Sequence, residues 1–282
     1  MAKETVGFIG VGEMGWPMAK GILDKGIDLM VHDIREDPVK ELKKLGAKVA
    51  GSPGEIGANC AITIIMVVDK AQAKEVIQGK NGILTTAKKG SMIVAMSTLD
   101  PFFCQEMAKI AAEKGVGFID APVSGGRGRA EAHTLTIMVG GEESLLKKCR
   151  YVLEAMGNNI VYMGKVGNGQ VMKLANNSIV HALLIGTAGG LTLAAKAGIP
   201  AERFLKILDT STGRNWVAQN WDYFWSKGTP EGKGSLYVTK KDIAMTRDTA
   251  RAYGLSLPLV EILPDLDLAE IIKNTQAEIK KK

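Results

Sequence analysis

The first half of the chain alternates between short apolar runs and stretches with apolar residues at helical spacing. Runs of strand length cover residues 5–10, 27–33, 61–68, 91–96, 116–120, 134–139 and 159–163. Helical patterns lie between several of them, at residues 14–25, 37–45, 101–114 and 142–156. Continuous apolar strands that alternate with helices are typical of a sheet covered on both faces. The pattern therefore predicts an α/β fold with a Rossmann-type doubly wound, parallel sheet.

The second half of the chain is predicted to be helical throughout. Residues 169–197 have the pattern of one long apolar helix, with Asn177 and His181 among its few polar positions. We therefore predict a sheet domain over residues 1–164 and an all-helical domain over residues 165–282. A helix that is apolar on most sides must be covered by neighbours, so we expect a subunit interface in the helical domain.

Composition and charge exclude several classes of protein. The net charge is +6, but no Lys/Arg stripe is interleaved with aromatic residues, so we expect no nucleic-acid partner. The first apolar run is too short for a signal peptide, and no apolar stretch is expected to span a membrane. Cys60, Cys104 and Cys149 contain no Cys-x-x-Cys pair, which indicates free thiols in a reducing compartment. We expect a cytoplasmic protein, although a processed matrix protein would look the same.

The three histidines do not indicate a metal site. His32, His133 and His181 are far apart in the sequence, and no carboxylates cluster with them. A metal site needs several such ligands in one place, so we expect none here.

The strongest local motif is the glycine-rich stretch that runs from Gly10 to Gly15. It follows the first predicted strand and opens a helix, as a dinucleotide-binding turn does. Gly10 permits the tight turn, Gly12 lets the backbone approach a pyrophosphate, and Gly15 lets the helix pack on the strand. The free N–H groups of the helix attract the phosphates. We expect Glu13 and Met14 to contact the cofactor too, although an ordinary strand-to-helix turn could also carry this motif.

The second predicted strand ends in an acid that bears on the choice of cofactor. Asp33 lies 18 residues after Gly15, about where a carboxylate bonds both ribose hydroxyls of NAD. A carboxylate repels the 2′-phosphate of NADP, whereas Arg35 could pair with it. We predict NAD and leave NADP open. The alternatives are a strand-end cap for Asp33 and a solvated charge for Arg35.

Two further strand ends are placed to touch the cofactor. Val67 and Val68 follow one strand, and Thr98 follows the next. Ligands of open α/β sheets bind outside the carboxyl ends of the strands, so we expect these residues in the cofactor site. Alternatively, each segment is an ordinary loop, with Ser97 or Thr98 as a helix cap.

The stretch Ser124-Gly125-Gly126 is a candidate anion site. It follows the strand that ends at Asp120, and it combines a hydroxyl with unhindered backbone N–H groups. Such a combination can hold a substrate carboxylate. A flexible turn is the alternative.

Lys173 is the candidate for proton transfer. Lys173 and Asn177 are four residues apart on the long apolar helix and share one face. A lysine in so apolar a helix is costly unless it has a role or extends to water. In a cleft, the side chain of Lys173 could pass a proton as a hydride moves, and Asn177 could hold a substrate oxygen. Spacing alone favours the alternative, in which Lys173 is exposed and Asn177 bonds across helices.

Four segments together resemble the β-hydroxyacid dehydrogenase family, the group of 3-hydroxyisobutyrate dehydrogenase and tartronate semialdehyde reductase. In order, they cover residues 7–15, 120–126, 167–177 and 241–243, the last of which reads Lys241-Asp242-Ile243. The resemblance implies an NAD(P)-dependent oxidoreductase that interconverts a small β- or γ-hydroxy acid and its semialdehyde or keto acid. It also implies a cofactor domain, a helical second domain and a homodimer or homotetramer.

The resemblance also implies a role for each site residue. Lys173 is the general acid/base, and Ser124, Gly125 and Gly126 bind the substrate carboxylate. Asn177 holds the substrate. Lys241 closes over the cofactor, and Asp242 supports that segment.

Several alternatives stay open at this point. A glyoxylate or succinic semialdehyde reductase and an imine reductase share the scaffold, but an imine reductase is expected to have another proton donor at Lys173. Chains of 6-phosphogluconate dehydrogenase are longer and carry His-Asn where this one has Asn176-Asn177. A non-catalytic dinucleotide-binding protein would not need Lys173, Asn177 and the Ser-Gly-Gly segment.

The sequence holds one unusual aromatic group. Trp216, Trp221 and Trp225 lie in a region that, by the resemblance, shapes the substrate pocket. Their bulk indicates either an unusual substrate or packing between helices, which is the commoner role of clustered aromatics.

Overall fold

The computed structural model describes residues 4–222 and 235–280, with the backbone alone over residues 235–239. The chain divides into two compact units, Met1–Lys173 and Leu174–Lys282. Helix α8 (Asn168–Lys196) runs from one unit into the other. The predicted domain boundary at residues 164/165 falls shortly before this division and stays a prediction.

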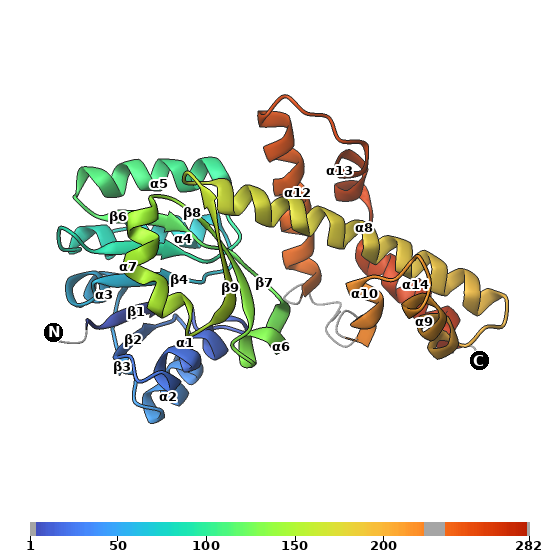
Figure 1. Cartoon of the computed structure of the whole chain (residues 1–282), viewed down its shortest axis with the longest axis horizontal. Helices are drawn as coiled ribbons and strands as arrows, with labels where there is room; N and C mark the ends of the chain where they lie inside the picture. The colour runs from blue at the N-terminus through green and yellow to red at the C-terminus, as the bar shows by residue number, and fades with distance from the viewer. Residues whose placement is uncertain (1–3, 223–234, 281–282) are drawn as a thin grey trace. The chain divides into compact units, whose positions relative to one another are not determined.

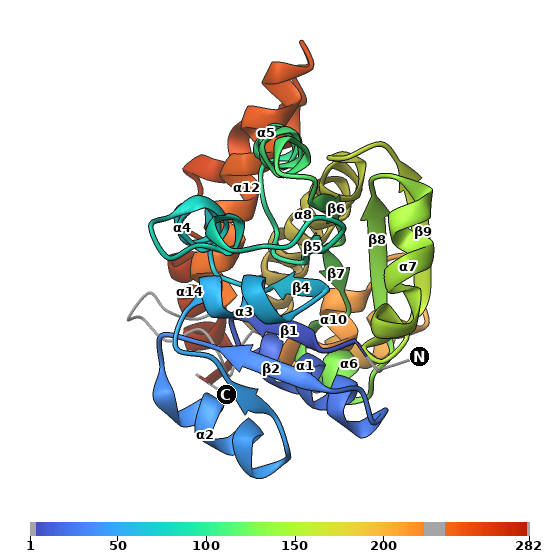
Figure 2. The ribbon, with the colours of Figure 1, turned by 90° about the vertical axis from the view of Figure 1, so that its left-hand side faces the viewer.

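The first unit is built on one sheet, whose strands appear in Figures 1 and 2. Its strands are β1 (Val6–Ile9), β2 (Leu29–His32), β3 (Lys48–Val49), β4 (Ile62–Ile65), β5 (Met92–Ala95), β6 (Gly117–Asp120), β7 (Val123–Ser124), β8 (Leu135–Gly140) and β9 (Gly157–Gly164). Their spatial order is β3-β2-β1-β4-β5-β6-β8-β7, and β9 pairs with β8. The order reverses between β1 and β4, which is where such sheets bind ligands. The predicted Rossmann-type fold is therefore confirmed.

Helices cover both faces of the sheet (Figure 2), because adjacent strand residues enter different cores. Phe8 of β1 belongs to the core shared with α1 and α2, whereas Ile9 belongs to the core shared with α4 and α5. This explains why the strands are continuous apolar runs rather than alternating ones. The helices of this unit are α1 (Gly15–Asp24), α2 (Glu36–Lys44), α3 (Pro53–Asn59), α4 (Lys70–Gln78), η1 (Ile83–Thr85), α5 (Pro101–Glu113), α6 (Gly126–Glu131) and α7 (Glu143–Leu153).

The sheet is parallel except at β8. This strand runs antiparallel to both β6 and β7. The chain between β7 and β8 holds only the short helix α6, and a parallel return needs a longer crossover. Strands β3 and β7 were not predicted, because two residues are too few to show a periodicity.

The second unit is helical, and no strand occurs among its described residues. After α8 come α9 (Ala201–Asp209), α10 (Trp216–Gln219), α12 (Ser235–Ala252), α13 (Pro258–Ile262), η2 (Leu263–Asp265) and α14 (Leu268–Lys280). Leu184, Leu191 and Ile272 form its main core together with Trp221. Trp221 is buried, which fits a packing role, whereas Trp216 is 38% exposed. Trp225 lies outside the described residues.

The expectation that no apolar stretch reaches membrane-spanning length was also wrong. Helix α8 has 29 residues and a window with a mean hydropathy of 1.6, so it could cross a bilayer by length and composition. No charged residue separates Lys173 from Lys196. Core helices of globular proteins meet the same criterion, and α8 buries Leu184, Ala188 and Leu191 in the core of the second unit.

Candidate functional site

The turn between β1 and α1 has room only for glycine at two of its positions. Gly10 has φ +92°, and a Cβ atom there would overlap the carbonyl group of Met66. A Cβ atom on Gly15 would overlap the carbonyl oxygen of Gly10. The N-cap residue of α1, Met14, makes no side-chain hydrogen bond to the helix, whereas Ser52 caps α3. No side chain therefore caps the start of α1 in the place that a bound pyrophosphate would take.

Asp33 links the end of β2 to this turn and is held on its other side by Arg35. The carboxylate of Asp33 accepts hydrogen bonds from the backbone N–H of Val11, at 2.9 Å, and of Arg35, also at 2.9 Å. Nε of Arg35 lies 3.2 Å from the same carboxylate. This hydrogen bond raises the pKa of Arg35. Asp33 is thus more than a strand-end cap, since it fixes the glycine turn.

The guanidinium group of Arg35 lies over the glycine turn. Its Nη2 atom is 3.0 Å from the place that a Cβ atom on Gly12 would occupy. Glu13 is exposed beside it. The structure therefore gathers Gly10, Gly12, Asp33 and Arg35 at one edge of the sheet, with a positive charge among them.

The other predicted cofactor residues follow neighbouring strands at this same edge. Val67 and Val68 come after β4, and Thr98 comes after β5, the next parallel strand. Val68 is 49% exposed, and its backbone N–H is bonded to Gln72 at 3.1 Å. The idea that Ser97 or Thr98 caps the following helix was wrong, because Asp100 is the N-cap of α5.

The two glycines of the Ser-Gly-Gly segment have backbone conformations that other residues rarely adopt. Ser124 ends β7 opposite Thr136 of β8. Gly125 has φ +136° and Gly126 has φ +68°, a region that side chains disfavour. The helix α6 starts directly at Gly126. The segment is therefore a turn at the start of a short helix.

Lys173 lies half-buried in the first turns of α8, and the start of this helix is bonded to a carboxylate that the sequence analysis did not assign to the site. Asp120 is fully buried at the end of β6, and it accepts hydrogen bonds from the backbone N–H groups of Gly167, at 2.7 Å, and Gln170, at 2.8 Å. Burial raises the pKa of Asp120 to about 6, and these N–H groups oppose the rise. Asp120 therefore caps the helix that carries Lys173.

The second unit brings together Asn177, Lys241 and Asp242. The amide nitrogen of Asn177 donates a hydrogen bond to Oδ2 of Asp242 at 2.7 Å, and both side chains are buried. The ammonium group of Lys241 lies 3.2 Å from the other oxygen of that carboxylate. Asp242 thus fixes both side chains. The contact joins residues 65 positions apart, so spacing could not have revealed it.

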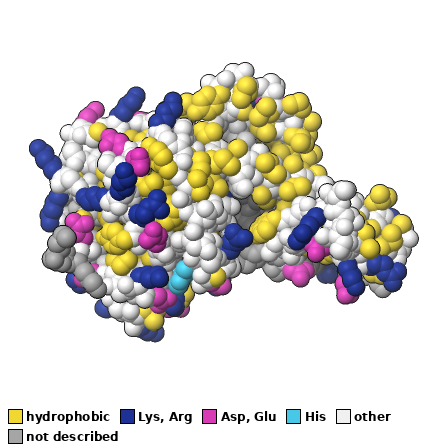
Figure 3. Space-filling model, viewed as in Figure 1, with side chains coloured by type: hydrophobic (Ala, Val, Ile, Leu, Met, Phe, Trp, Pro, Cys, Tyr) yellow, Lys and Arg dark blue, Asp and Glu magenta, His cyan; other side chains and the backbone are white. Residues whose placement is uncertain are grey.

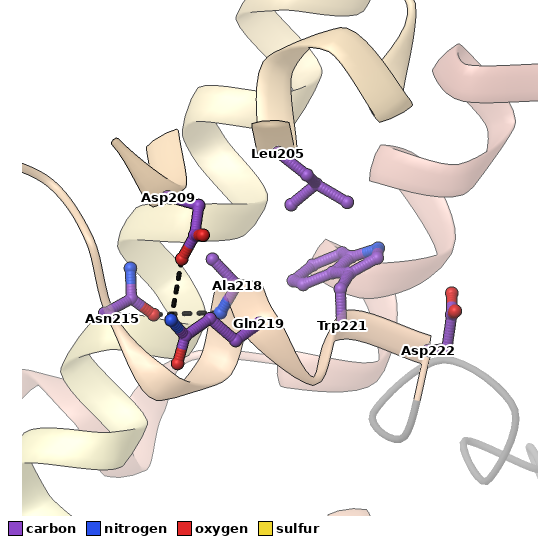
Figure 4. A pocket seen from close by; sticks show the side chains of 7 residues that line it. All are labelled: Leu205, Asp209, Asn215, Ala218, Gln219, Trp221 and Asp222. Carbon is purple, nitrogen blue, oxygen red and sulfur yellow. Dashed lines mark hydrogen bonds between the residues drawn. The ribbon is translucent and has the colours of Figure 1, made fainter. Parts of the chain in front are cut away.

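In the described part of the chain, neither a metal cluster nor a pocket offers an alternative functional site. Over residues 4–222 and 235–280, no three His, Cys, Asp or Glu side chains are grouped to hold a metal ion. A pocket of about 500 Å³ in the second unit (Figure 4) is lined by Trp221, but by none of the residues predicted to catalyse or to bind the cofactor or the substrate carboxylate. Its polar groups bond one another: Gln219 donates to Asp209, and Asn215 caps α10.

Comparisons with known proteins identify both halves of the chain. Residues 5–164 match the NAD-binding domain of 6-phosphogluconate dehydrogenase, and residues 167–276 match the NAD-binding domain of NADP-dependent 3-hydroxyisobutyrate dehydrogenase. The mitochondrial 3-hydroxyisobutyrate dehydrogenase of Mus musculus is 39% identical over 88% of this chain and 76% of its own length. The 2-(hydroxymethyl)glutarate dehydrogenase of Eubacterium barkeri is 33% identical over 90% of this chain and 85% of its own length.

Solved structures agree with this relationship. The 3-hydroxyisobutyrate dehydrogenase of Salmonella typhimurium has a TM-score of 0.87 and 26% identity, and covers 96% of this chain and 99% of its own. An imine reductase of Myxococcus stipitatus, with a TM-score of 0.68 and 19% identity over 96% of this chain and 94% of its own, shares the fold alone.

We predict that Gly15→Ala weakens binding of the reduced cofactor at least about tenfold, because the new methyl group overlaps the carbonyl oxygen of Gly10. Quenching or enhancement of NADH fluorescence on titration measures the affinity. Gly186→Ala is the matched control, since nothing lies within 4 Å of a Cβ atom on this helical glycine. Equal affinities for the Gly15→Ala variant and the wild type would contradict the assignment of the turn.

Proposed function

The chain belongs to the β-hydroxyacid dehydrogenase family and is a nicotinamide-dependent hydroxyacid dehydrogenase, and on that premise we propose its substrate class and the role of each site residue. It interconverts a small β- or γ-hydroxy acid and its semialdehyde or keto acid. The acid's carboxylate binds Ser124, Gly125 and Gly126. Lys173 is the general acid/base at the reacting oxygen, and Asn177 holds the substrate.

The separate roles of the cofactor and of Lys173 follow from the chemistry of the reaction. When bound, the nicotinamide supplies or takes up the hydride. As an alcohol is oxidised, its hydroxyl proton must leave, and the neutral amine of Lys173 accepts it. In the reverse direction, the ammonium group of Lys173 donates a proton to the carbonyl oxygen. Lys241 holds the cofactor, and Asp242 fixes Lys241 and Asn177.

The observation that best supports this proposal is where α8 begins. The first turn of α8 is bonded to Asp120 of β6 and to the loop after β5, at the edge that carries the glycine turn. Lys173 follows within one helical turn of these bonds. A lysine held at this edge is suited to proton transfer in a way that an exposed lysine elsewhere on the helix is not.

The named relatives act on small hydroxy acids with a free carboxylate, which supports the same class here. Relatives with imine reductase names share only the fold at their identities of 17–19%. A panel of 3-hydroxyisobutyrate, tartronate semialdehyde, succinic semialdehyde and glyoxylate separates the substrate alternatives. A cytoplasmic location stays a prediction.

We predict that Lys173→Ala lowers turnover by about 100- to 10,000-fold, the usual contribution of general acid/base catalysis, while NADH still binds. Absorbance at the nicotinamide band measures turnover on the panel, and fluorescence titration measures binding. Lys196→Ala is the control, because this lysine lies on the same helix, is 62% exposed and pairs with Glu278. Near-normal turnover of the Lys173→Ala variant would exclude Lys173 as the general acid/base.

For the cofactor, we propose NAD as the preferred form and NADP as a weaker alternative. Asp33 at the end of β2 would bond the ribose hydroxyls, and Arg35, which pairs with it, would bind a 2′-phosphate. Arg35→Leu should therefore raise the preference for NAD over NADP, measured as the ratio of kcat/KM values, by about tenfold. Arg150→Leu, which removes an arginine of α7, should leave the ratio unchanged. An unchanged ratio in the Arg35→Leu variant would exclude Arg35 from cofactor choice.

We also propose that a second copy of the chain covers the exposed apolar surface of the second unit. Figure 3 shows apolar side chains gathered over α12 and α13, and Leu259 of α13 is 59% exposed. On α8, Ile179 is 62% and Leu193 is 73% exposed, in a stretch without charged residues. Monomers rarely leave so much apolar surface in water, and a self-complementary contact pairs apolar with apolar.

We predict that Leu193→Glu shifts the particle from a dimer or tetramer towards the monomer, because the new carboxylate would have to be buried at the contact. Light scattering during size-exclusion chromatography measures the mass. Leu45→Glu, at a 49% exposed position of the first unit, is the control. A wild-type monomer at micromolar concentration would overturn the proposal.

A further inference from the structure

A buried hydrogen-bond network joins the first turn of α8 to two neighbouring strand ends. The carboxylate of Asp120 accepts hydrogen bonds from the backbone N–H groups of Gly167, at 2.7 Å, and Gln170, at 2.8 Å. The side chain of Gln170 continues the network to the loop after β5. Its amide oxygen accepts the N–H of Leu99 at 2.9 Å, and its amide nitrogen donates to the carbonyl oxygen of Ser97, also at 2.9 Å.

The packing around Asp120 leaves room for this carboxylate and for little else. A Cβ atom on Gly140 would lie 2.6 Å from Oδ1 of Asp120, and one on Gly169 would lie 2.7 Å from Oδ2. Both Asp120 and Gln170 are completely buried. A buried charge is costly unless its partners are well placed. The positions of Asp120 and of its hydrogen-bond donors are therefore tightly restricted.

We propose that Asp120 and Gln170 are positioning residues that fix the first turn of α8 and thereby the direction of the Lys173 side chain. The inference rests on the proposed role of Lys173. Gln170 and Lys173 are three residues apart on one helix face, so the rotation of the helix at Gln170 sets the direction of Lys173. A helix end without these bonds frays, because its first N–H groups have no intrahelical partner.

The network also links the parts of the site that must act together. Asp120 ends the strand that leads to Ser124, and Gln170 bonds the segment that carries Thr98. The strand that leads to the Ser-Gly-Gly segment, the loop that carries Thr98 and the helix that carries Lys173 are thus joined by one set of buried bonds. Catalytic groups need to be held within a fraction of an ångström, which loops alone do not provide.

The test is a double-mutant cycle on the full-length enzyme, with kcat, KM and NADH affinity as readouts. Gln170→Met keeps the size of the side chain but loses both of its hydrogen bonds. We expect kcat to fall about 10- to 100-fold, with KM and NADH affinity within about threefold of the wild type. In a Lys173→Ala background, Gln170→Met should change kcat by less than about threefold, because residues that act through one another are not additive.

A matched control and a second variant complete the design. Gln105→Met is the control, since Gln105 bonds the carbonyl oxygen of Val166, outside α8, at 3.3 Å, and it should retain wild-type kcat. Asp120→Asn keeps the shape and one acceptor oxygen, so it should show the same division between kcat and KM with a smaller loss. If Gln170→Met does not fold, the kcat and KM of Asp120→Asn test the positioning role instead.

The outcomes separate this inference from the proposed function. Normal turnover in Lys173→Ala overturns the role of Lys173 itself. An inactive Lys173→Ala variant combined with wild-type kcat in Gln170→Met overturns only the positioning role. An equal loss from Gln170→Met in both backgrounds overturns it too, because a general loss of structure acts independently of Lys173.

Discussion

The capping of α8 by the buried carboxylate of Asp120 is the constraint on which the rest of the site depends. A long helix needs partners for its first N–H groups, and here Asp120 supplies them from the end of β6 rather than from the helix's own side chains. Burial raises the pKa of Asp120 to about 6, so the group is predominantly a carboxylate at neutral pH. Its negative charge is stabilised by the partial positive charge at the start of the helix. The helix that carries Lys173 therefore starts where the sheet ends.

A carboxylate also organises the cofactor end of the sheet. Asp33 bonds the backbone of the glycine turn and is itself held by Arg35, so one carboxylate shapes the turn and carries the charge that we propose to govern cofactor choice. In the second unit, Asp242 holds Asn177 and Lys241. The glycine turn, the start of α8 and the contact between Asn177 and Lys241 are thus each organised by one acid.

Much of the fold was predictable because its signal is local. Apolar runs of strand length separated by helical patterns indicated the doubly wound sheet, and the uniform apolar texture of α8 indicated a helical second half. Strands β3 and β7 were missed because two residues carry no pattern, and the direction of β8 depends on a connection rather than on the strand itself. The absence of charge between Lys173 and Lys196, which makes α8 apolar enough to span a membrane, was readable in the sequence, where it predicted a buried helix.

The candidate site, too, was predictable from the sequence only where its signal is local. The glycine turn, Asp33 and the Ser-Gly-Gly segment have recognisable local chemistry, and Lys173 gained its assignment from the motif around it. The contacts of Asp120 and Gln170 join residues 50 or more positions apart, apart from one at 47, and follow from the fold alone. Position along a sequence does not show which strand end meets which helix.

The most direct test of the central claim is chemical rescue of the Lys173→Ala variant by small primary amines. If the missing function is a correctly placed amine, turnover of the variant should rise with amine concentration and depend on the basicity of the amine, while the rate of the wild type stays unchanged. A variant that turns over a hydroxy acid at the wild-type rate without added amine would contradict the account.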